Sequence, residues 1–238
     1  MLRTLRAGVV PATMILLAGC LHVGPDSNSV TLDFNFTVPD VSADWEVGAA
    51  DFPVGSEADV ADSGGVRTLP SPLPTTQQAL YQSGTNPTGN LFVFQKKRFV
   101  LLAPNTSYRV ALSLEFASNV QSGCTSPLAT SVWVKAGVSG LEPIVAPDAG
   151  NVYRLNLDKG EQSLAGDYTQ LSDIKNGLAG CPTTGTYSLR TTARQTQTAF
   201  VTSDAEGGFW LFIGTQSAAN GQRHEIYITD LRMTVFAN

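Results

Sequence analysis

The sequence predicts an all-β protein, a single antiparallel β-sandwich with long loops and one short helix. Three observations support this prediction. Apolar and polar residues alternate along several short segments, turn-forming residues separate these segments, and helical spacing of apolar residues occurs only once. The chain has 238 residues, of which 42% are hydrophobic, so it is long enough for one domain with a substantial core.

The clearest strand pattern covers residues 107–116, where the alternation is unbroken. Tyr108, Val110 and Leu112 fall on one face with the apolar residues that follow, and the polar residues fall on the other. A turn at 103–106, which contains Pro and Asn, precedes the segment. The apolar run 91–102 comes before this turn, so we expect the two segments to pair as a hairpin.

The same alternation occurs over residues 30–37. Six further segments have strand character, so about nine or ten strands are expected in all; these six are 131–136, 152–157, 187–192, 199–203, 209–214 and 225–236. The last of them changes phase, because the inward parity of Ile226 and Ile228 does not match that of Leu231. This change predicts a β-bulge near Thr229 and Asp230.

Two segments depart from the strand pattern. Residues 53–90 are rich in Gly, Pro, Ser and Thr and show no period, which predicts a long irregular loop. Residues 169–178 place Leu171, Ile174 and Leu178 at helical spacing, which predicts the one short helix.

The N-terminus has the features of an export signal. Arg3 and Arg6 precede an apolar run over residues 7–17, which is too short to span a bilayer and is the length of a signal-peptide core. The run ends in Leu17-Ala18-Gly19-Cys20, which resembles the lipobox of bacterial lipoproteins.

This resemblance implies three regions. Residues 1–19 would be a cleaved signal peptide, residues 20–29 a lipidated Cys20 and a short tether, and residues 30–238 the β-sandwich domain. In that family the cysteine receives a diacylglyceryl group and its new amino group is acylated, with palmitate among the expected chains. The implied location is the bacterial cell envelope, at the outer membrane or cell surface, with the N-terminal lipid holding the protein on the membrane.

The two remaining cysteines form an even pair in an exported protein. Cys124 and Cys181 both lie in turn-like surroundings, so we expect a disulfide that joins two loops. No metal site is expected from them, because the sequence has no CxxC motif and His224 is the only histidine outside the tether.

Two segments resemble carbohydrate-binding modules and other galactose-binding-like jelly rolls. Residues 102–110 (LAPNTSYRV) are similar to a hairpin of these proteins, and residues 226–233 (IYITDLRM) are similar to their closing strand. The resemblance implies a jelly-roll topology. Because an acid in the closing strand and another near the first strand hold calcium in some of these proteins, it also makes Asp33 and Asp230 candidates for a structural calcium site; no other cofactor is expected.

Aromatic side chains are the expected sugar-stacking residues of such a module. Trp45 and Tyr81 flank or occupy the irregular region, where exposure is plausible, and they are the candidate ligand-binding residues. Trp133 and Trp210 lie in apolar strands and are expected in the core.

The sequence favours a non-catalytic, monomeric binding protein with glycan as the leading ligand. No nucleophile or zinc-protease motif is present. The acids Glu115, Glu142, Asp158 and Glu161 form no pair with a distinctive spacing. A formal charge of −5 excludes a basic nucleic-acid binder. A glycoside hydrolase with unrecognised carboxylates and a protein-interaction or structural module of the envelope remain open alternatives.

The lipid on Cys20 can be tested directly. Mass spectrometry of the matured protein should show an N-terminal Cys20 that carries acyl chains, because the lipobox directs cleavage before the modified cysteine. An unmodified thiol at this position would contradict the prediction.

Overall fold

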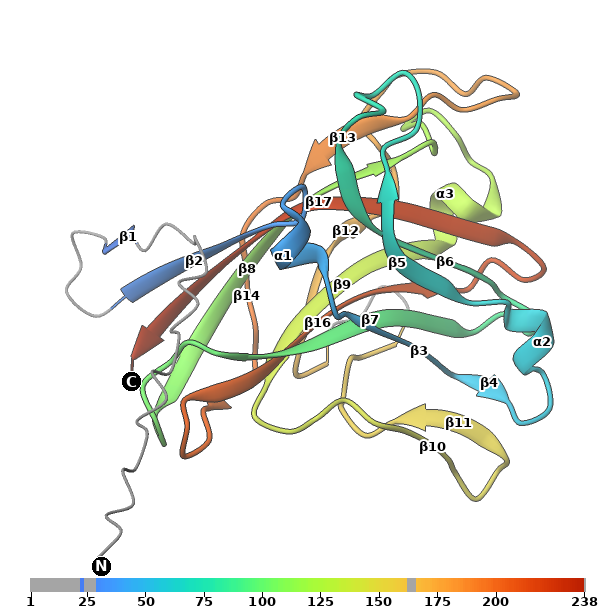
Figure 1. Cartoon of the computed structure of the whole chain (residues 1–238). Coiled ribbons are helices and arrows are strands. Elements are labelled where there is room, and N and C mark those ends of the chain that lie inside the picture. The colour runs from blue at the N-terminus through green and yellow to red at the C-terminus, as the bar shows by residue number, and fades with distance from the viewer. Residues whose placement is uncertain (1–21, 24–28, 162–165, 238) are drawn as a thin grey trace, which may run out of the picture.

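Two antiparallel sheets form the body of the protein in the computed structural model, which describes residues 22–23, 29–161 and 166–237 (Figure 1). The expected β-sandwich is confirmed. The predicted signal peptide, Cys20 and most of the tether lie outside the described residues.

Strand pairing defines three sheets within the described part of the chain. The larger sheet of the sandwich, here sheet A, contains β1 (His22–Val23), β2 (Ser29–Asn35), β5 (Ser63–Thr68), β6 (Gln78–Thr85), β8 (Ser107–Ser118), β13 (Ser188–Thr191), β14 (Gln195–Thr196), β15 (Val201–Thr202) and β17 (Arg223–Ala237). The second sheet, sheet B, has the order β12 (Thr169–Asp173), β9 (Val132–Ser139), β16 (Gly208–Ser217), β7 (Leu91–Val100) and β3 (Glu46–Ala50). A small third sheet contains β10 (Val145–Pro147), β11 (Val152–Leu155) and β4 (Phe52–Pro53).

The long strand β17 organises sheet A. One of its edges pairs with β8 over most of its length, and the other edge pairs first with β6 and then with β2. The register against β8 shifts between Ile228 and Asp230, which confirms the predicted bulge. The bulge lets Ile226 and Ile228 point inward together with Leu231, although period two would place them on opposite faces.

The core lies between sheets A and B. Alternate residues of β8 and β17 pack against alternate residues of β9 and β16, and the same cluster includes Phe34 and Phe99. Burial of these apolar side chains is the main favourable term in folding.

The predicted hairpin of residues 91–102 and 107–116 is wrong. The first segment forms β7 in sheet B and the second forms β8 in sheet A, so the intervening turn carries the chain from one layer to the other. Both segments carry enough apolar residues to pack into the core. Their sequences do not indicate which strand each one pairs with.

Two other predictions are corrected. The segment expected to be irregular, residues 53–90, contains the paired strands β5 and β6, because β17 offers β6 a long partner. The helix expected at 169–178 is absent, since residues 169–173 form the edge strand β12 against β9 and bury Leu171 there. The helices found in the described residues are α1 (Pro39–Ser42), α2 (Glu57–Val60) and α3 (Pro127–Ser131).

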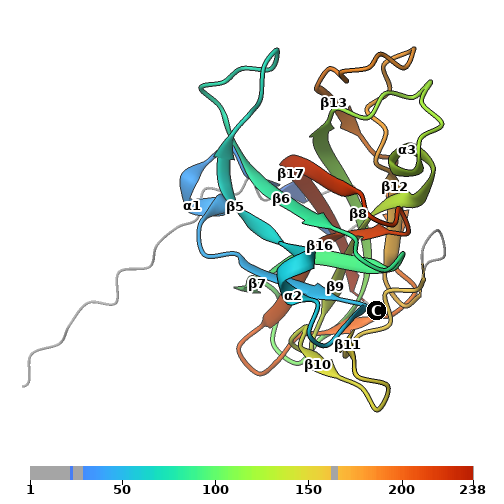
Figure 2. The ribbon, with the colours of Figure 1, turned by 90° about the vertical axis from the view of Figure 1, so that its right-hand side faces the viewer.

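The small third sheet covers part of the outer face of sheet B. Its β10–β11 hairpin projects at the lower edge of the molecule in both views (Figures 1 and 2), and β10 and β11 contact β3. Beneath it, Phe92, Phe94 and Phe212 of sheet B form a second apolar cluster with Leu157 and Tyr168.

The predicted disulfide is present. Cys124 and Cys181 are joined with an S–S distance of 2.04 Å and lie 57 residues apart in the sequence. The bond ties the loop after β8 to the loop before β13, as expected from the turn-like surroundings of both cysteines.

Helices long and apolar enough to cross a bilayer are not found in the residues that the structure describes.

Removing the disulfide should destabilise the sandwich. The double variant Cys124→Ala/Cys181→Ala is expected to lose about 2–4 kcal/mol of unfolding free energy, because the unfolded chain regains the freedom of the opened loop. Urea denaturation followed by circular dichroism measures this loss. An unchanged midpoint would contradict the prediction.

Candidate functional site

A polar groove of about 400 Å³ lies on the outer face of sheet A. Alternation explains its composition, because the residues of β2, β8 and β17 that do not face the core must face outward here. The side chains that define it are Asn35, Ser113, Glu115, Thr191, Asp230 and Arg232.

Glu115 lines this groove, and two hydroxyl donors fix its carboxylate. Thr229 Oγ1 donates to Glu115 Oε1 at 2.8 Å, and Thr191 Oγ1 donates to Oε2 at 3.2 Å. Because the bulge in β17 turns the Thr229 side chain toward Glu115, the carboxylate orientation is fixed by the same register shift that aligns the core.

Asp230 lies directly across from Glu115 in the β8–β17 pairing. Burial raises the pKa of Asp230 to about 6, and repulsion from the Asp33 carboxylate adds to this shift. The groove therefore contains one hydrogen-bonded carboxylate and one carboxyl group that takes up a proton near pH 6.

Asp33 is engaged by an arginine. Arg232 Nε donates to Asp33 Oδ1 at 2.6 Å, between directly paired residues of β2 and β17. Arg232 lines the groove, so this ion pair lies at its border.

The two calcium candidates, Asp33 and Asp230, are thus brought to one face by neighbouring strands. Calcium needs six to eight oxygen ligands. In the part of the chain that the structure describes, no group of three or more His, Cys, Asp or Glu side chains is placed to hold a metal ion.

Tyr81 is not the exposed platform that the sequence analysis expected. It is 1% exposed and packs with Tyr187, Tyr227 and Leu189 on the outer face of sheet A, while its hydroxyl donates to Glu225 Oε2 at 2.8 Å. Leu189 also lines the groove, so this tyrosine cluster forms an apolar border beside it.

Trp45 is also buried, with 8% of its surface exposed. It packs edge-on against Phe36 and Phe99, and its Nε1 donates to the Val41 carbonyl at 3.0 Å. Phe36 lies in the turn after β2, Val41 lies in α1, and Phe99 lies in β7, far away in the sequence, so the sequence did not predict the burial.

Trp133 and Trp210, expected in the core, are half-buried on the outer face of sheet B. The ammonium of Lys96 lies 5.0 Å from the centre of the Trp210 ring.

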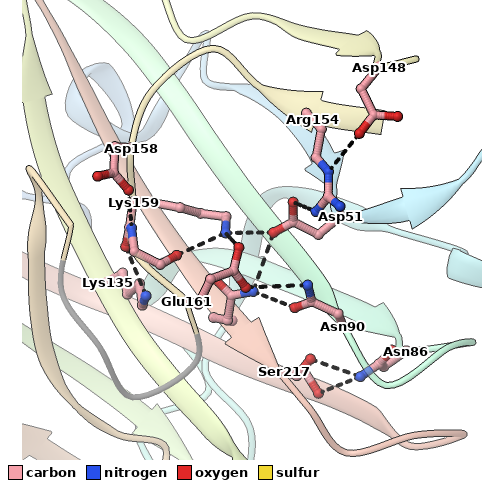
Figure 3. Close-up of polar contacts among 12 residues, drawn as sticks. Asp51, Asn86, Asn90, Lys135, Asp148, Arg154, Asp158, Lys159, Glu161 and Ser217 are labelled. Carbon is pink, nitrogen blue, oxygen red and sulfur yellow. Dashed lines mark hydrogen bonds and ion pairs between the residues drawn. The ribbon is translucent and has the colours of Figure 1, made fainter. Parts of the chain in front are cut away.

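A second polar site lies between sheet B and the third sheet (Figure 3). Asp51, in the bend between β3 and β4, accepts a hydrogen bond from Arg154 Nη1 at 2.9 Å and forms an ion pair with Lys159 at 2.5 Å. Gln216 Nε2 donates to Asp51 at 3.3 Å and to Asn90 at 2.7 Å.

Lys135 contacts this cluster through the backbone of Lys159. It is a buried residue of β9, and its Nζ donates to the carbonyl of Lys159 at 2.8 Å (Figure 3). Burial and the nearby Lys159 charge lower the pKa of Lys135 to about 8. A buried lysine therefore positions the backbone of the loop that follows β11.

The other acids named from the sequence have local structural partners. Glu142 pairs with Lys96 at 2.5 Å, Glu161 pairs with Lys159 at 3.9 Å, and Asp158 Oδ1 accepts the amide of Gly160. His224 is buried beside Thr215, and burial lowers its pKa to about 4.

The sequence predicts only part of the groove. It indicates Asp33 and Asp230 as calcium candidates and Glu115 as an acid without a partner of distinctive spacing. It gives no signal for Asn35, Ser113 and Thr191, because each is an ordinary outward polar residue of a strand. Only the pairing of β2, β8, β13 and β17 brings them together.

Comparison with protein-family models and with curated proteins finds no match. Among solved structures, the chain is similar to the carbohydrate-binding module TmCBM61 in complex with β-1,4-galactotriose, at 10% identity and a TM-score of 0.37, covering 86% of this chain and 95% of that one. A putative sugar-binding protein from Bacteroides thetaiotaomicron matches at 11% identity and a TM-score of 0.38, covering 86% of this chain and 92% of the other.

The enzymatically active domain of tailspike protein 4 from bacteriophage CBA120 matches at 10% identity and a TM-score of 0.36 over 84% of this chain. The chain spans about a fifth of that protein, 21% of its length. At identities and TM-scores this low, the overlap is coarse, and the fold described here depends on the chain's own strands and registers.

The raised pKa of Asp230 predicts a stability cost at neutral pH. Its folded pKa, about 6, exceeds the ordinary value of 3.8, so the native state is favoured below pH 3.8 and loses this advantage as the pH rises through 6. Asp230→Asn should therefore melt at a higher temperature than the wild type at pH 7.5, and the difference should shrink below pH 6 and vanish near pH 3.8.

Thermal melts across this pH range measure the effect. Asp62→Asn, which removes an exposed carboxylate, is the control for loss of one charge. A wild type that melts at or above the temperature of Asp230→Asn at pH 7.5 would contradict the assignment.

Proposed function

We propose that this protein is a non-catalytic glycan-binding module that binds its ligand in the groove on the outer face of sheet A. The observation that carries the proposal is the groove itself, in which neutral and charged hydrogen-bonding side chains from four strands converge over about 400 Å³. This volume falls within the range of small-molecule binding sites.

The chemistry of the lining suits a hydroxyl-rich ligand. Asn35, Thr37, Gln77 and Ser113 offer both donors and acceptors, as the alternating hydroxyls of a sugar require. Glu115 and Asp230 add strong acceptors, and a carboxylate that accepts a sugar hydroxyl forms a charge-assisted hydrogen bond.

The groove is also largely preorganised. Ser113, Glu115 and Asp230 lie on paired strands of one sheet, and the Glu115 carboxylate already accepts two threonine hydroxyls. Binding therefore orders few side chains, which lowers the entropic cost of association. Leu189 and the neighbouring Tyr187 offer an apolar border against which a sugar ring can pack.

We further propose that the module works at the bacterial cell envelope, held there by a lipid on Cys20. Cys20 lies two residues before β1 (His22–Val23), which pairs with β2 at the edge of sheet A, so the lipid would be attached close to the sandwich. Such an anchor would hold the groove close to surface polysaccharide.

A second function is favoured by one specific observation. Glu115 and Asp230 are directly paired, so their Cβ atoms lie about 4.5–5.5 Å apart, and burial raises the pKa of Asp230 to about 6. Two carboxyl groups that face one groove, one of them with a raised pKa, are the arrangement that glycoside hydrolysis uses. Release of new reducing ends from a bound glycan, abolished in Glu115→Gln, would favour this alternative.

A glycan-array screen of the purified protein, followed by titration calorimetry on the strongest hits, tests the binding proposal. Ser113→Trp should weaken binding at least tenfold, because the indole would fill the centre of the groove. Failure of the wild type to bind any glycan would contradict the proposal.

Ser107→Trp is a matched control. Ser107 is also a half-buried serine on the same face of β8, about 20 Å from Ser113 along the strand and not part of the groove. It should bind as the wild type does. Equal loss of binding in both variants would indicate a general effect on sheet A and would contradict the assignment to the groove.

A further inference from the structure

The ion pair between Asp51 and Lys159 is a nearly enclosed polar contact in the cluster of Figure 3. Lys159 Nζ lies 2.5 Å from Asp51 Oδ2, and the two side chains are 5% and 4% exposed. The Phe92 ring covers the ammonium, with its centre 5.2 Å from Nζ. The two groups are thus held together in a site from which bulk water is nearly excluded.

Both oxygens of the Asp51 carboxyl group also accept hydrogen bonds. Arg154 Nη1 donates to Oδ1 at 2.9 Å, and Gln216 Nε2 lies 3.3 Å from Oδ2. Donors in this arrangement polarise a carboxyl group and stabilise negative charge that develops on its oxygens when the carbon is attacked.

A third carboxylate adjoins the pair. Glu161 Oε1 lies 3.9 Å from Lys159 Nζ, so the ammonium is close to two carboxylates (Figure 3). The Glu161 side chain is exposed, so it can exchange protons with solvent. A group of this kind can take a proton from an amine and later deliver it to a leaving oxygen.

We propose that Lys159 and Asp51 condense to an intramolecular amide bond. A proton passes from the ammonium to the carboxylate, which gives a neutral amine and a carboxylic acid. Nζ then attacks Cγ of Asp51, Glu161 accepts the amine proton and returns it to the departing Oδ2, and one C–N bond forms as one C–O bond breaks. The ion pair is converted to an amide and one water molecule, and no oxidant or co-reactant is required.

The distance between Lys159 Nζ and Asp51 Cγ is close to that from which an amine can attack a carbonyl carbon. A C–O bond is about 1.2 Å long, so an amine 2.5 Å from Oδ2 lies within about 3.7 Å of Cγ, near the separation of reactants poised for attack. Water exclusion favours condensation over hydrolysis. Arg154 cannot replace Lys159 as the nucleophile, because its guanidinium is not deprotonated in proteins.

The bond would join the bend between β3 and β4 to the loop after β11. It would hold the third sheet on sheet B covalently, by a route independent of the disulfide, which links other loops.

Peptide mass spectrometry of the full-length protein tests the proposal. Trypsin should fail to cleave after Lys159, and residues 155–175 should be recovered joined to the peptide that ends at Arg67, with a combined mass lower by one water, about 18 Da. Complete cleavage after Lys159 with both peptides at their unmodified masses would show an ordinary ion pair and overturn the proposal.

Lys159→Arg is the matched control, because it keeps a buried cation beside Asp51 but removes the nucleophile. The joined peptide and the mass loss should both disappear. If the Asp51 peptide of Lys159→Arg still lacks one water, the loss reflects cyclisation at Asp51 and the proposal is wrong. Should this variant fail to fold, the wild-type digest alone decides the question.

Glu161→Gln tests the part assigned to Glu161. The joined fraction of freshly made protein should fall at least tenfold, while the far-ultraviolet circular dichroism should match that of the wild type. A fully joined Glu161→Gln protein would overturn the role of Glu161.

Discussion

The register shift in β17 between Ile228 and Asp230 is the constraint on which much of this structure depends. Without it, period-two alternation would expose either Ile226 and Ile228 or the apolar residues that follow. The bulge resolves this conflict by leaving Thr229 and Asp230 together at the outer face. The same local irregularity therefore completes the core and furnishes the groove with a hydroxyl donor and a partly buried carboxyl group. Bulges commonly redirect side chains in this way beside functional sites.

Burial disfavours the charged form of Asp230, whereas glycan binding in the groove would use its carboxylate. Asp33 adds repulsion, so at neutral pH the folded protein carries a carboxylate that packing alone would not select. Surface positions elsewhere on sheet A satisfy the same alternation with uncharged residues such as Thr31 and Thr234, whose hydroxyls bond to each other. A destabilising acid on an otherwise well-satisfied sheet is typical of a residue retained for binding.

Local patterns in the sequence were sufficient for the strands with clear alternation, such as β2, β8 and β17, and for the bulge and the disulfide, because each depends on periodicity or on nearby turn residues. The partners of strands that lie far apart in the sequence could not be predicted from these local patterns. The chain crosses from sheet B to sheet A between residues 100 and 107, where the sequence pattern indicated a hairpin, and residues 169–173 gain their strand from β9 and not from their own helical spacing. Trp45 and Tyr81 were expected at the surface because their covering partners, Phe99 and Tyr227, lie far away in the sequence. The groove could not be predicted for the same reason, because its lining residues come from strands that are far apart in the sequence.

The Cys124–Cys181 disulfide joins two loops, and the buried ion cluster at Asp51 lies between sheet B and the third sheet, so neither occupies the groove on the outer face of β8 and β17. If a glycan binds on this outer face, amide chemical-shift mapping by NMR, with isotope-labelled protein and a bound oligosaccharide, shows it most directly. The largest changes should fall on residues 113–115 and 229–232. Changes confined to sheet B, with these amides unmoved at saturation, would contradict binding on this face.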